Sequence, residues 1–220
     1  MKQFVFFDLD GTLADTDPDI RGAWKAALVD LGLACPAFDE KFVAGPPIDE
    51  MTRTLFPDRF TQELADAIRV RFASHYDNDG FPETKEYPGV LDEVRRLKAE
   101  GRVAAIVTNK RYAGATAMAR HFGWDRVFDG VFAGDMFADP VVAARFGMPV
   151  GKVRKPELLA AVMRHFDAAP GDCALVGDTA SDFEAAATNG VLSVGVNWGY
   201  GTADELSRAD MLCRALPFPL

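Results

Sequence analysis

Residues 4–12 read FVFFDLDGT, an apolar run that leads directly into two carboxylates, Asp8 and Asp10. Four successive apolar residues predict a short strand buried on both faces, which is typical of a parallel sheet. Gly11 allows the chain to turn sharply behind it. The two carboxylates repel each other unless a cation lies between them or they share a proton. Mg²⁺, which prefers oxygen ligands, is one cation that fits, although a solvated acidic turn can carry the same letters.

Four further apolar runs predict strands, and helical patterns separate most of them. After Pro88-Gly89, apolar residues recur at helical spacing until Gly101, which is a typical helix C-terminal cap. Alternating strands and helices predict an α/β fold, a Rossmann-like parallel sheet covered on both faces. The further strands are expected at Val103–Val107, Val131–Ala133, Ala174–Val176 and Leu192–Val196.

The stretch from residue 15 to residue 83 breaks this alternation because it contains no convincing buried strand. It reads instead as helices at Ile20–Leu31, Ile48–Phe56 and Phe60–Tyr76, punctuated by turns, among them Asn78-Asp79-Gly80. We therefore predict a helical domain over residues 15–83, inserted into an α/β core domain formed by residues 1–14 and 84–220.

Acidic residues outnumber basic ones, since 24 Lys+Arg and 33 Asp+Glu give a formal net charge of −9. Nucleic acid and anionic membranes repel such a surface, so neither is expected as the main partner. No apolar run approaches the roughly 20 residues that span a bilayer, and the N-terminal run is too short for a signal peptide. Cys35, Cys173 and Cys213 form no CxxC pair, which indicates neither a zinc site nor a disulfide framework. We expect a cytoplasmic protein.

Polar side chains follow the expected strand 103–107. Thr108, Asn109 and Lys110 offer a hydroxyl, an amide and a cation, and all three can hold phosphate oxygens. A plain strand-to-helix cap would explain them equally well. Pro156 fits the first turn of a helix and places Lys155 at the helix start, where the helix dipole disfavours a cation. Lys155 is therefore either an ordinary surface lysine or the neighbour of an anion.

The run GDTASD, which follows the expected strand 174–176, carries Asp178 and Asp182 four residues apart across a strand-to-helix turn. Both can face the same point, although an N-cap aspartate with a first-turn acid would also fit. Ligands of parallel sheets bind at the carboxyl ends of the strands, where Asp8, Thr108 and Asp178 are all expected. Several carboxylates, a lysine and a hydroxyl around one crevice suit a phosphoryl group together with a hard cation.

The order of these motifs, DxDGT, then TN, KP and GDxxxD, resembles that of the haloacid dehalogenase (HAD) superfamily of phosphohydrolases. The resemblance covers nearly the whole chain, and the helical insert is similar to the C1 cap of that family. Weaker similarities point to the phosphoglycolate phosphatase-like branch. They lie at residues 15–19, Gly45-Pro46-Pro47, Tyr87-Pro88-Gly89-Val90, Thr108-Asn109-Lys110 and residues 197–201.

The resemblance implies a role for each carboxylate. Asp8 would be the nucleophile that forms an aspartyl-phosphate, and Asp10 would act as general acid and then as general base. Mg²⁺ would be held by Asp8, by the backbone carbonyl of Asp10 and by Asp178. Asp182 would support the ion through water or by orienting Lys155.

The resemblance also implies a phosphate site. Thr108 and Lys155 would bind the phosphoryl oxygens, and Gly11 and Asn109 would complete their surroundings. The segment before Lys155 is long and contains Lys152, which is a rival for the same role. We prefer Lys155 because it adjoins Pro156 at the expected helix start.

The family implies a Mg²⁺-dependent phosphomonoesterase that acts on a small phosphorylated metabolite such as 2-phosphoglycolate. Asp10 argues against a dehalogenase, and Ile20 stands where a phosphomutase would carry histidine. Lys25 and Lys41 leave a phosphonatase open, and pyrophosphate or nucleoside monophosphates are alternative substrates. A Mg²⁺-dependent binding protein without catalytic activity is the alternative outside enzymes. Either a monomer or a homodimer is compatible with the sequence.

Substrate choice is expected to depend on the helical insert and on a cation beside the phosphate site. A phosphoglycolate carries a carboxylate that needs a positive partner. Arg53 in the insert and Lys110 in the core are the candidates, whereas a solvated helix face would equally explain Arg53.

Overall fold

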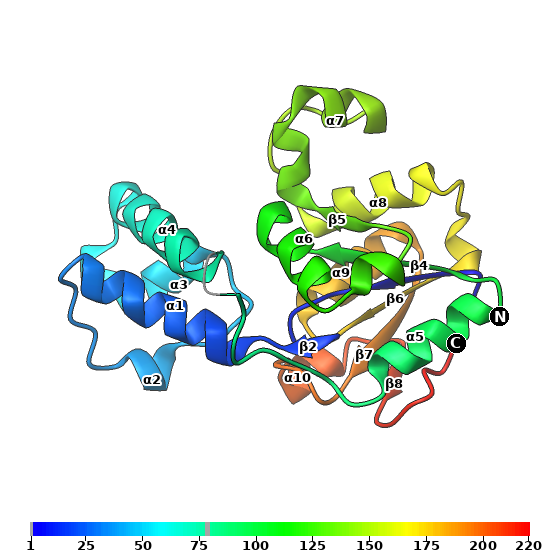
Figure 1. Cartoon of the computed structure of the whole chain (residues 1–220), viewed down its shortest axis with the longest axis horizontal. Helices are drawn as coiled ribbons and strands as arrows, with labels where there is room; N and C mark the ends of the chain where they lie inside the picture. The colour runs from blue at the N-terminus through cyan, green and yellow to red at the C-terminus, as the bar shows by residue number, and fades with distance from the viewer. Residues whose placement is uncertain (1, 78–79) are drawn as a thin grey trace. The chain divides into compact units, whose positions relative to one another are not determined.

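A parallel sheet built around β1 is the centre of the larger of two units in the computed structural model, which describes residues 2–77 and 80–220 (Figure 1). Within these residues the sheet has six strands in the order β5-β4-β1-β6-β7-β8. β1 pairs in parallel with β4 on one side, where Phe4 is opposite Val103, and with β6 on the other. The strands are β1 (Phe4–Phe7), β4 (Val103–Thr108), β5 (Val131–Ala133), β6 (Cys173–Gly177), β7 (Leu192–Val196) and β8 (Met211–Cys213).

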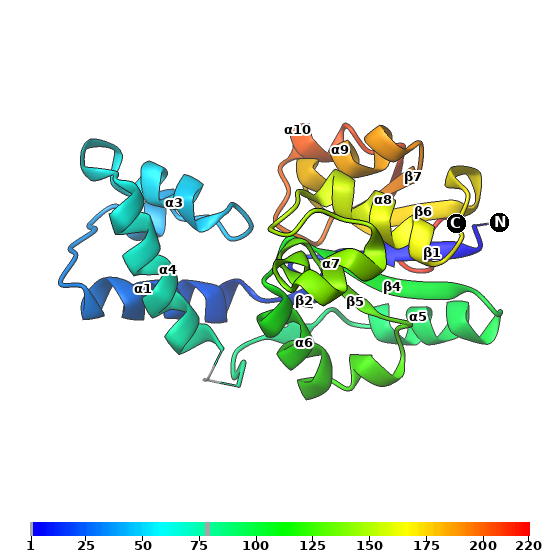
Figure 2. The same ribbon diagram turned by 90° about the horizontal axis from the view of Figure 1, so that it is seen from above.

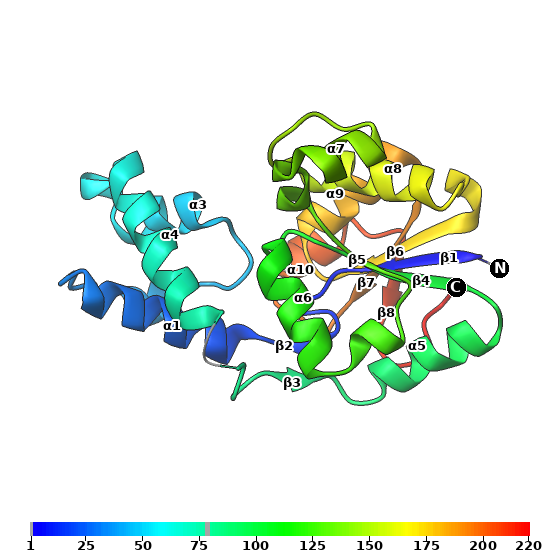
Figure 3. The same ribbon diagram turned by 45° about the horizontal axis from the view of Figure 1, so that its top comes forward.

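Helices cover both faces of this sheet (Figures 2 and 3). On one face, Phe6 of β1 and Leu175 of β6 pack against Leu158 and Val162 of α8 in a fully buried apolar cluster. α5 and α6 lie on the opposite face, as Figure 3 shows. The helices of this unit are α5 (Val90–Ala99), α6 (Tyr112–His121), α7 (Pro140–Phe146), α8 (Lys155–His165), α9 (Ala180–Asn189) and α10 (Ala203–Leu206), with 3₁₀ turns at Trp124–Arg126, Gly134–Ala138 and Pro170–Asp172.

The second unit, Thr16–Lys85, is helical. Trp24 of α1 is buried against Phe42 and Phe72, with ring centroids 5.7 and 6.1 Å away. Thr61 caps α4, because its side chain accepts a hydrogen bond from the backbone N–H of Leu64 at 3.1 Å. The helices are α1 (Asp17–Asp30), α2 (Phe38–Lys41), α3 (Ile48–Leu55) and α4 (Gln62–Tyr76), with a 3₁₀ turn at Pro57–Arg59.

Two short strands mark the places where the chain passes between the units. They are β2 (Ala14–Asp15) and β3 (Lys85–Glu86), and they pair as a separate two-stranded sheet. The core unit comprises Met1–Asp15 and Glu86–Leu220. The division thus falls close to the expected limits at residues 15 and 83. That the helical unit acts as a cap remains a prediction.

The predicted α/β class is confirmed, and each of the five expected strands is present within one residue of its expected ends. The edge strand β8 was not expected: its apolar run, Met211–Cys213, is only three residues long, and Met211 and Leu212 are exposed in the fold. The expected helix Phe60–Tyr76 begins two residues later than predicted, after the cap at Thr61. The turn expected at Asn78-Asp79-Gly80 includes residues outside the described ranges. Among the described residues, no helix combines the length and the apolar character needed to cross a bilayer.

Candidate active site

The loop that follows β1 is held by backbone hydrogen bonds both to β6 and within itself. Asp8 donates its N–H to Val176 O of β6 at 2.9 Å, and Gly11 donates to Ala14 O at 3.0 Å. Gly11 has φ +76°, a conformation that favours glycine. A Cβ added there would lie 2.2 Å from Asp178 Oδ2, so only glycine lets this loop approach the end of β6.

Asp178, directly after β6, is fully buried and receives a hydrogen bond on each carboxylate oxygen. Thr12 Oγ1 donates to Oδ1 at 3.0 Å, and the backbone N–H of Tyr200 donates to Oδ2 at 2.7 Å. Burial, together with the charges of Asp182 and Asp8, raises the pKa of Asp178 to about 7. A buried carboxylate of this kind gains from a nearby cation.

Lys155 is the first residue of α8, and it is 2% exposed. Its Nζ lies 2.9 Å from Asp8 Oδ1 and also forms an ion pair with Asp182 Oδ1. Burial lowers the pKa of Lys155, but the charges of Asp182 and Asp8 more than reverse this and raise it above the usual value. Lys152 is exposed, so Lys155 is the lysine that the fold places among the carboxylates.

Asp182 is fully buried and holds the start of α9 as well as Lys155. Its Oδ2 accepts from the backbone N–H of Thr179 at 3.0 Å and from Thr179 Oγ1 at 2.9 Å, which completes a capping box. Gly177 is needed beside it, because a Cβ there would lie 2.2 Å from Asp182 Cγ. Both oxygens of Asp182 are therefore occupied by protein contacts, which fits a residue that orients Lys155.

Three carboxylates meet between the ends of β1 and β6. Among the described residues, Asp8, Asp178 and Asp182 each bring one oxygen to within 4.8 Å of the others. Burial raises the pKa of Asp8 to about 6, with Lys155 opposing and the charges of Asp182 and Asp10 adding to the shift. Buried carboxylate oxygens that are costly to ionise are a donor set suited to a hard divalent cation. The residues present thus fit a magnesium site in which Asp8 and Asp178 supply the oxygens.

The carboxylate of Asp10 pairs with Lys110 rather than with Lys155, and its Oδ1 lies 2.9 Å from Lys110 Nζ. The Lys110 side chain is 7% exposed and that of Asp10 is 17% exposed. The side chain of Asp10 is therefore outside the three-carboxylate cluster. Lys110 follows β4, and its backbone N–H donates to Thr108 Oγ1 at 3.2 Å.

Thr108 ends β4, and Asn109 follows it at the same edge of the sheet. Thr108 is 1% exposed, whereas Asn109 is exposed and donates from Nδ2 to Ser181 Oγ at 2.8 Å. Ser181 belongs to α9, so this bond joins the polar residues after β4 to those after β6. The expected meeting of the polar residues after strands β1, β4 and β6 is thus observed.

The segment that follows β7, residues 197–201, contacts this site, although no chemical role was expected for it from the sequence. A Cβ on Gly199 would lie 2.4 Å from Asp178 Oδ2, and one on Gly201 would lie 1.7 Å from Asp178 O. Trp198 Nε1 donates to Thr12 O at 3.3 Å. The alternation of glycine and aromatic residues was the available signal, but it does not say which neighbour they approach.

Arg53 belongs to the helical unit, where it is exposed and its guanidinium stacks over the Phe60 ring at 3.9 Å. Its role in substrate choice stays a prediction.

Comparison with known proteins gives consistent matches over nearly the whole chain. The family model of haloacid dehalogenase-like hydrolases matches residues 3–190. A phosphoglycolate phosphatase of Neisseria gonorrhoeae is 32% identical over 229 residues, which cover 98% of this chain and 90% of that protein. A 5'-nucleotidase of Pseudomonas aeruginosa is 28% identical over 205 residues, covering 92% of this chain and 86% of that protein. The crystal structure of a predicted phosphatase from Clostridium acetobutylicum superposes with a TM-score of 0.80 at 24% identity, covering 96% and 93% of the two chains.

Proposed function

Because the chain belongs to the haloacid dehalogenase-like hydrolases and is a phosphatase of that family, we propose that it hydrolyses small phosphomonoesters through an aspartyl-phosphate on Asp8, with Mg²⁺ as its cofactor. The observation that carries the proposal is the buried cluster of Asp8, Asp178 and Asp182, in which Lys155 forms ion pairs with Asp8 and Asp182. It combines a nucleophile, oxygen ligands for a cation and a fixed positive charge.

In the first half of the reaction, a carboxylate oxygen of Asp8 forms a bond to phosphorus, and the bond from phosphorus to the leaving oxygen breaks. Asp10 gives its proton to that oxygen, so the product leaves as an alcohol. In the second half, Asp10 takes a proton from water as the water oxygen attacks phosphorus. The bond from phosphorus to Asp8 then breaks, phosphate leaves, and both carboxyl groups regain their starting forms.

The approach of an anionic nucleophile to an anionic phosphate requires positive charge around the phosphoryl oxygens. Lys155 supplies one such charge beside Asp8, and the Thr108 hydroxyl is a hydrogen-bond donor for the same oxygens. When bound at Asp8 and Asp178, Mg²⁺ would supply further positive charge that screens this repulsion. Asp182 keeps Lys155 in place, and its own second oxygen is held by Thr179.

The contact between Lys110 and Asp10 supports a substrate that carries a second acidic group. Lys110 is almost buried and lies beside the residue that protonates the leaving group. A carboxylate close to the leaving oxygen, as in 2-phosphoglycolate, would find its counter-charge there. The similarity to a phosphoglycolate phosphatase favours this substrate, and the similarity to a 5'-nucleotidase favours nucleoside monophosphates as the second candidate.

The test is phosphate release from a panel comprising phosphoglycolate, pyrophosphate, nucleoside monophosphates, sugar phosphates and an aryl phosphate, each with Mg²⁺ and with a chelator. Asp8→Asn is the control. Turnover of phosphoglycolate that needs Mg²⁺ and is lost in the variant is the expected result. Preference for a nucleotide would replace the substrate but keep the mechanism. No release from any compound would contradict the proposed phosphatase activity.

A further inference from the structure

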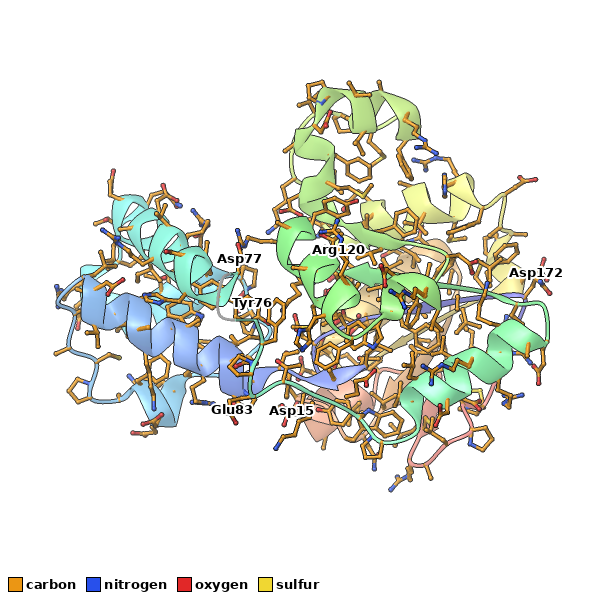
Figure 4. All side chains as sticks on the ribbon, viewed as in Figure 1. Asp15, Tyr76, Asp77, Glu83, Arg120 and Asp172 are labelled. Atoms are coloured by element: carbon orange, nitrogen blue, oxygen red, sulfur yellow. The ribbon has the colours of Figure 1, made fainter. Side chains whose placement is uncertain are left out.

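Tyr200 lies between the Asp178 carboxylate and the strand from which the chain leaves the core unit. Its backbone N–H donates to Asp178 Oδ2 at 2.7 Å, and its hydroxyl donates to Asp15 Oδ1 at 3.0 Å. Asp15, labelled in Figure 4, ends β2 and is the last residue of the core unit before Thr16. One residue therefore contacts both a candidate metal ligand and the point of exit to the helical unit.

The Asp178 carboxylate has little room to move without moving Tyr200. A Cβ on Gly199 would approach Asp178 Oδ2 to 2.4 Å, and a Cβ on Gly11 would approach the Tyr200 ring at Cδ2 to 2.9 Å. On its other side Asp178 is held by the Thr12 hydroxyl at 3.0 Å. Because close-packed interiors pass a displacement to their neighbours, a shift of this carboxylate is passed to Tyr200.

We propose that Tyr200 is a positioning residue that transmits the metal occupancy of Asp178 to β2. The inference rests on the proposed function, since it takes Asp178 to be a ligand of the divalent ion. An ion bound at Asp178 fixes its carboxylate, and with it the Tyr200 backbone and the hydrogen bond from the Tyr200 hydroxyl to Asp15. By thermodynamic linkage, a bond that metal binding strengthens must strengthen metal binding by the same factor.

The consequence concerns the attachment of the helical unit. Thr16–Lys85 is joined covalently to the core unit after Asp15 and before Glu86. If β2 becomes better ordered when the metal binds, the order of the first attachment, after Asp15, depends on the metal. Metal binding then orders β2 before the substrate binds.

The first measurement is calorimetric titration of the whole protein with Mg²⁺ alone, without substrate. Tyr200→Phe keeps the backbone N–H and loses only the hydroxyl, so it breaks the link to Asp15 and leaves the Asp178 contact in place. We expect Mg²⁺ binding to weaken by about 3-fold, and by no more than the roughly 10-fold that one net hydrogen bond allows, because only the part of the bond that the ion strengthens contributes. Asp15→Asn retains an oxygen acceptor for the hydroxyl and should stay within about 2-fold of the wild type.

The second measurement is hydrogen exchange with and without Mg²⁺. In the wild type and in Asp15→Asn, Mg²⁺ should slow exchange in peptides that cover residues 13–17. In Tyr200→Phe this protection should be lost, whereas residues 8–12 should still gain protection from Mg²⁺. Circular dichroism checks that each variant folds. Asp15→Ala breaks the same bond from its other end and replaces Tyr200→Phe if that variant fails to fold.

Equal Mg²⁺ affinity and equal protection of residues 13–17 in the wild type and in Tyr200→Phe would overturn the inference while leaving the metal site intact. Failure of the wild type to bind Mg²⁺ would instead contradict the metal site itself, and the inference would fall with it.

Discussion

Replacing Asp178 by asparagine should stabilise the protein when divalent cations are removed by a chelator. The carboxylate is buried, and its pKa is raised from 3.8 to about 7. The folded state therefore retains a proton that the unfolded state loses between about pH 4 and pH 7, so the wild type loses stability as the pH rises through this window. Full ionisation of Asp178 costs about 4 kcal/mol at pH 8, since each tenfold change in acidity corresponds to about 1.4 kcal/mol.

Asparagine can keep both contacts of the carboxylate. The amide oxygen can accept from the Tyr200 N–H, and the amide nitrogen can donate to the Thr12 hydroxyl, which both donates and accepts. The variant should consequently lack the part of the pH-dependent loss of stability that comes from Asp178. Between pH 5 and pH 8 its advantage over the wild type should grow by about 2–3 kcal/mol, less than the full cost because part of the loss precedes pH 5.

Urea denaturation at pH 5 and pH 8, with chelator and then with Mg²⁺, measures this difference. Mg²⁺ should stabilise the wild type at pH 8 but have little effect on Asp178→Asn, because the ion has lost a ligand. The exposed Asp172, labelled in Figure 4, provides the matched control, and Asp172→Asn should follow the wild type at both pH values. Equal changes of stability with pH in Asp178→Asn and in the wild type would show that Asp178 does not have the raised pKa on which this expectation rests.

Three further substitutions test other parts of the site. Lys155→Met leaves two buried carboxylates without their cation. Urea denaturation should show that the free energy of unfolding falls by about 3–5 kcal/mol, and kcat/KM should fall at least about 1000-fold. The exposed Lys152→Met is the control and should change neither quantity. Lys110→Met should lower selectivity for phosphoglycolate over an aryl phosphate by about 10-fold or more, as the ratio of the two kcat/KM values; an unchanged ratio would remove Lys110 from the substrate site. Gly11→Ala should cost about 2–4 kcal/mol in thermal unfolding and abolish Mg²⁺ stabilisation, because its Cβ would lie 2.2 Å from a carboxylate oxygen. Gly123→Ala, with a similar φ of +71° but open space around it, should cost only about 1–2 kcal/mol and leave the Mg²⁺ response unchanged.

The central strands could be predicted because their physics is local. β1, β4 and β6 are buried on both faces, so each appears in the sequence as an uninterrupted apolar run. β8 was not found this way: Met211–Cys213 is an apolar run of only three residues, and Met211 and Leu212 at the edge of the sheet are exposed rather than buried. The alternation of elements also predicted which strand ends would come together, since parallel strands present their carboxyl ends at one edge.

The finer arrangement of the site depends on contacts between distant segments. Spacing alone left Lys152 and Lys155 as rivals, and their burial in the fold separates them. The pairing of Lys110 with Asp10 joins residues that are one hundred positions apart, which no local pattern records. The approach of Gly199 to Asp178 is similar, because glycine in a sequence indicates freedom of the backbone without indicating its neighbour.

The central claim is that Asp8 carries the phosphoryl group during turnover. The direct measurement is mass spectrometry of acid-quenched enzyme in the presence of Mg²⁺ and phosphoglycolate, or the best substrate of the panel. Asp10→Asn should slow hydrolysis of the intermediate and so increase its amount when the substrate is an aryl phosphate, whose leaving group needs little help from a general acid. We expect a phosphate on Asp8 that is lost at alkaline pH and is absent from Asp8→Asn. Turnover without any phosphorylated Asp8, or turnover that persists in Asp8→Asn, would contradict it.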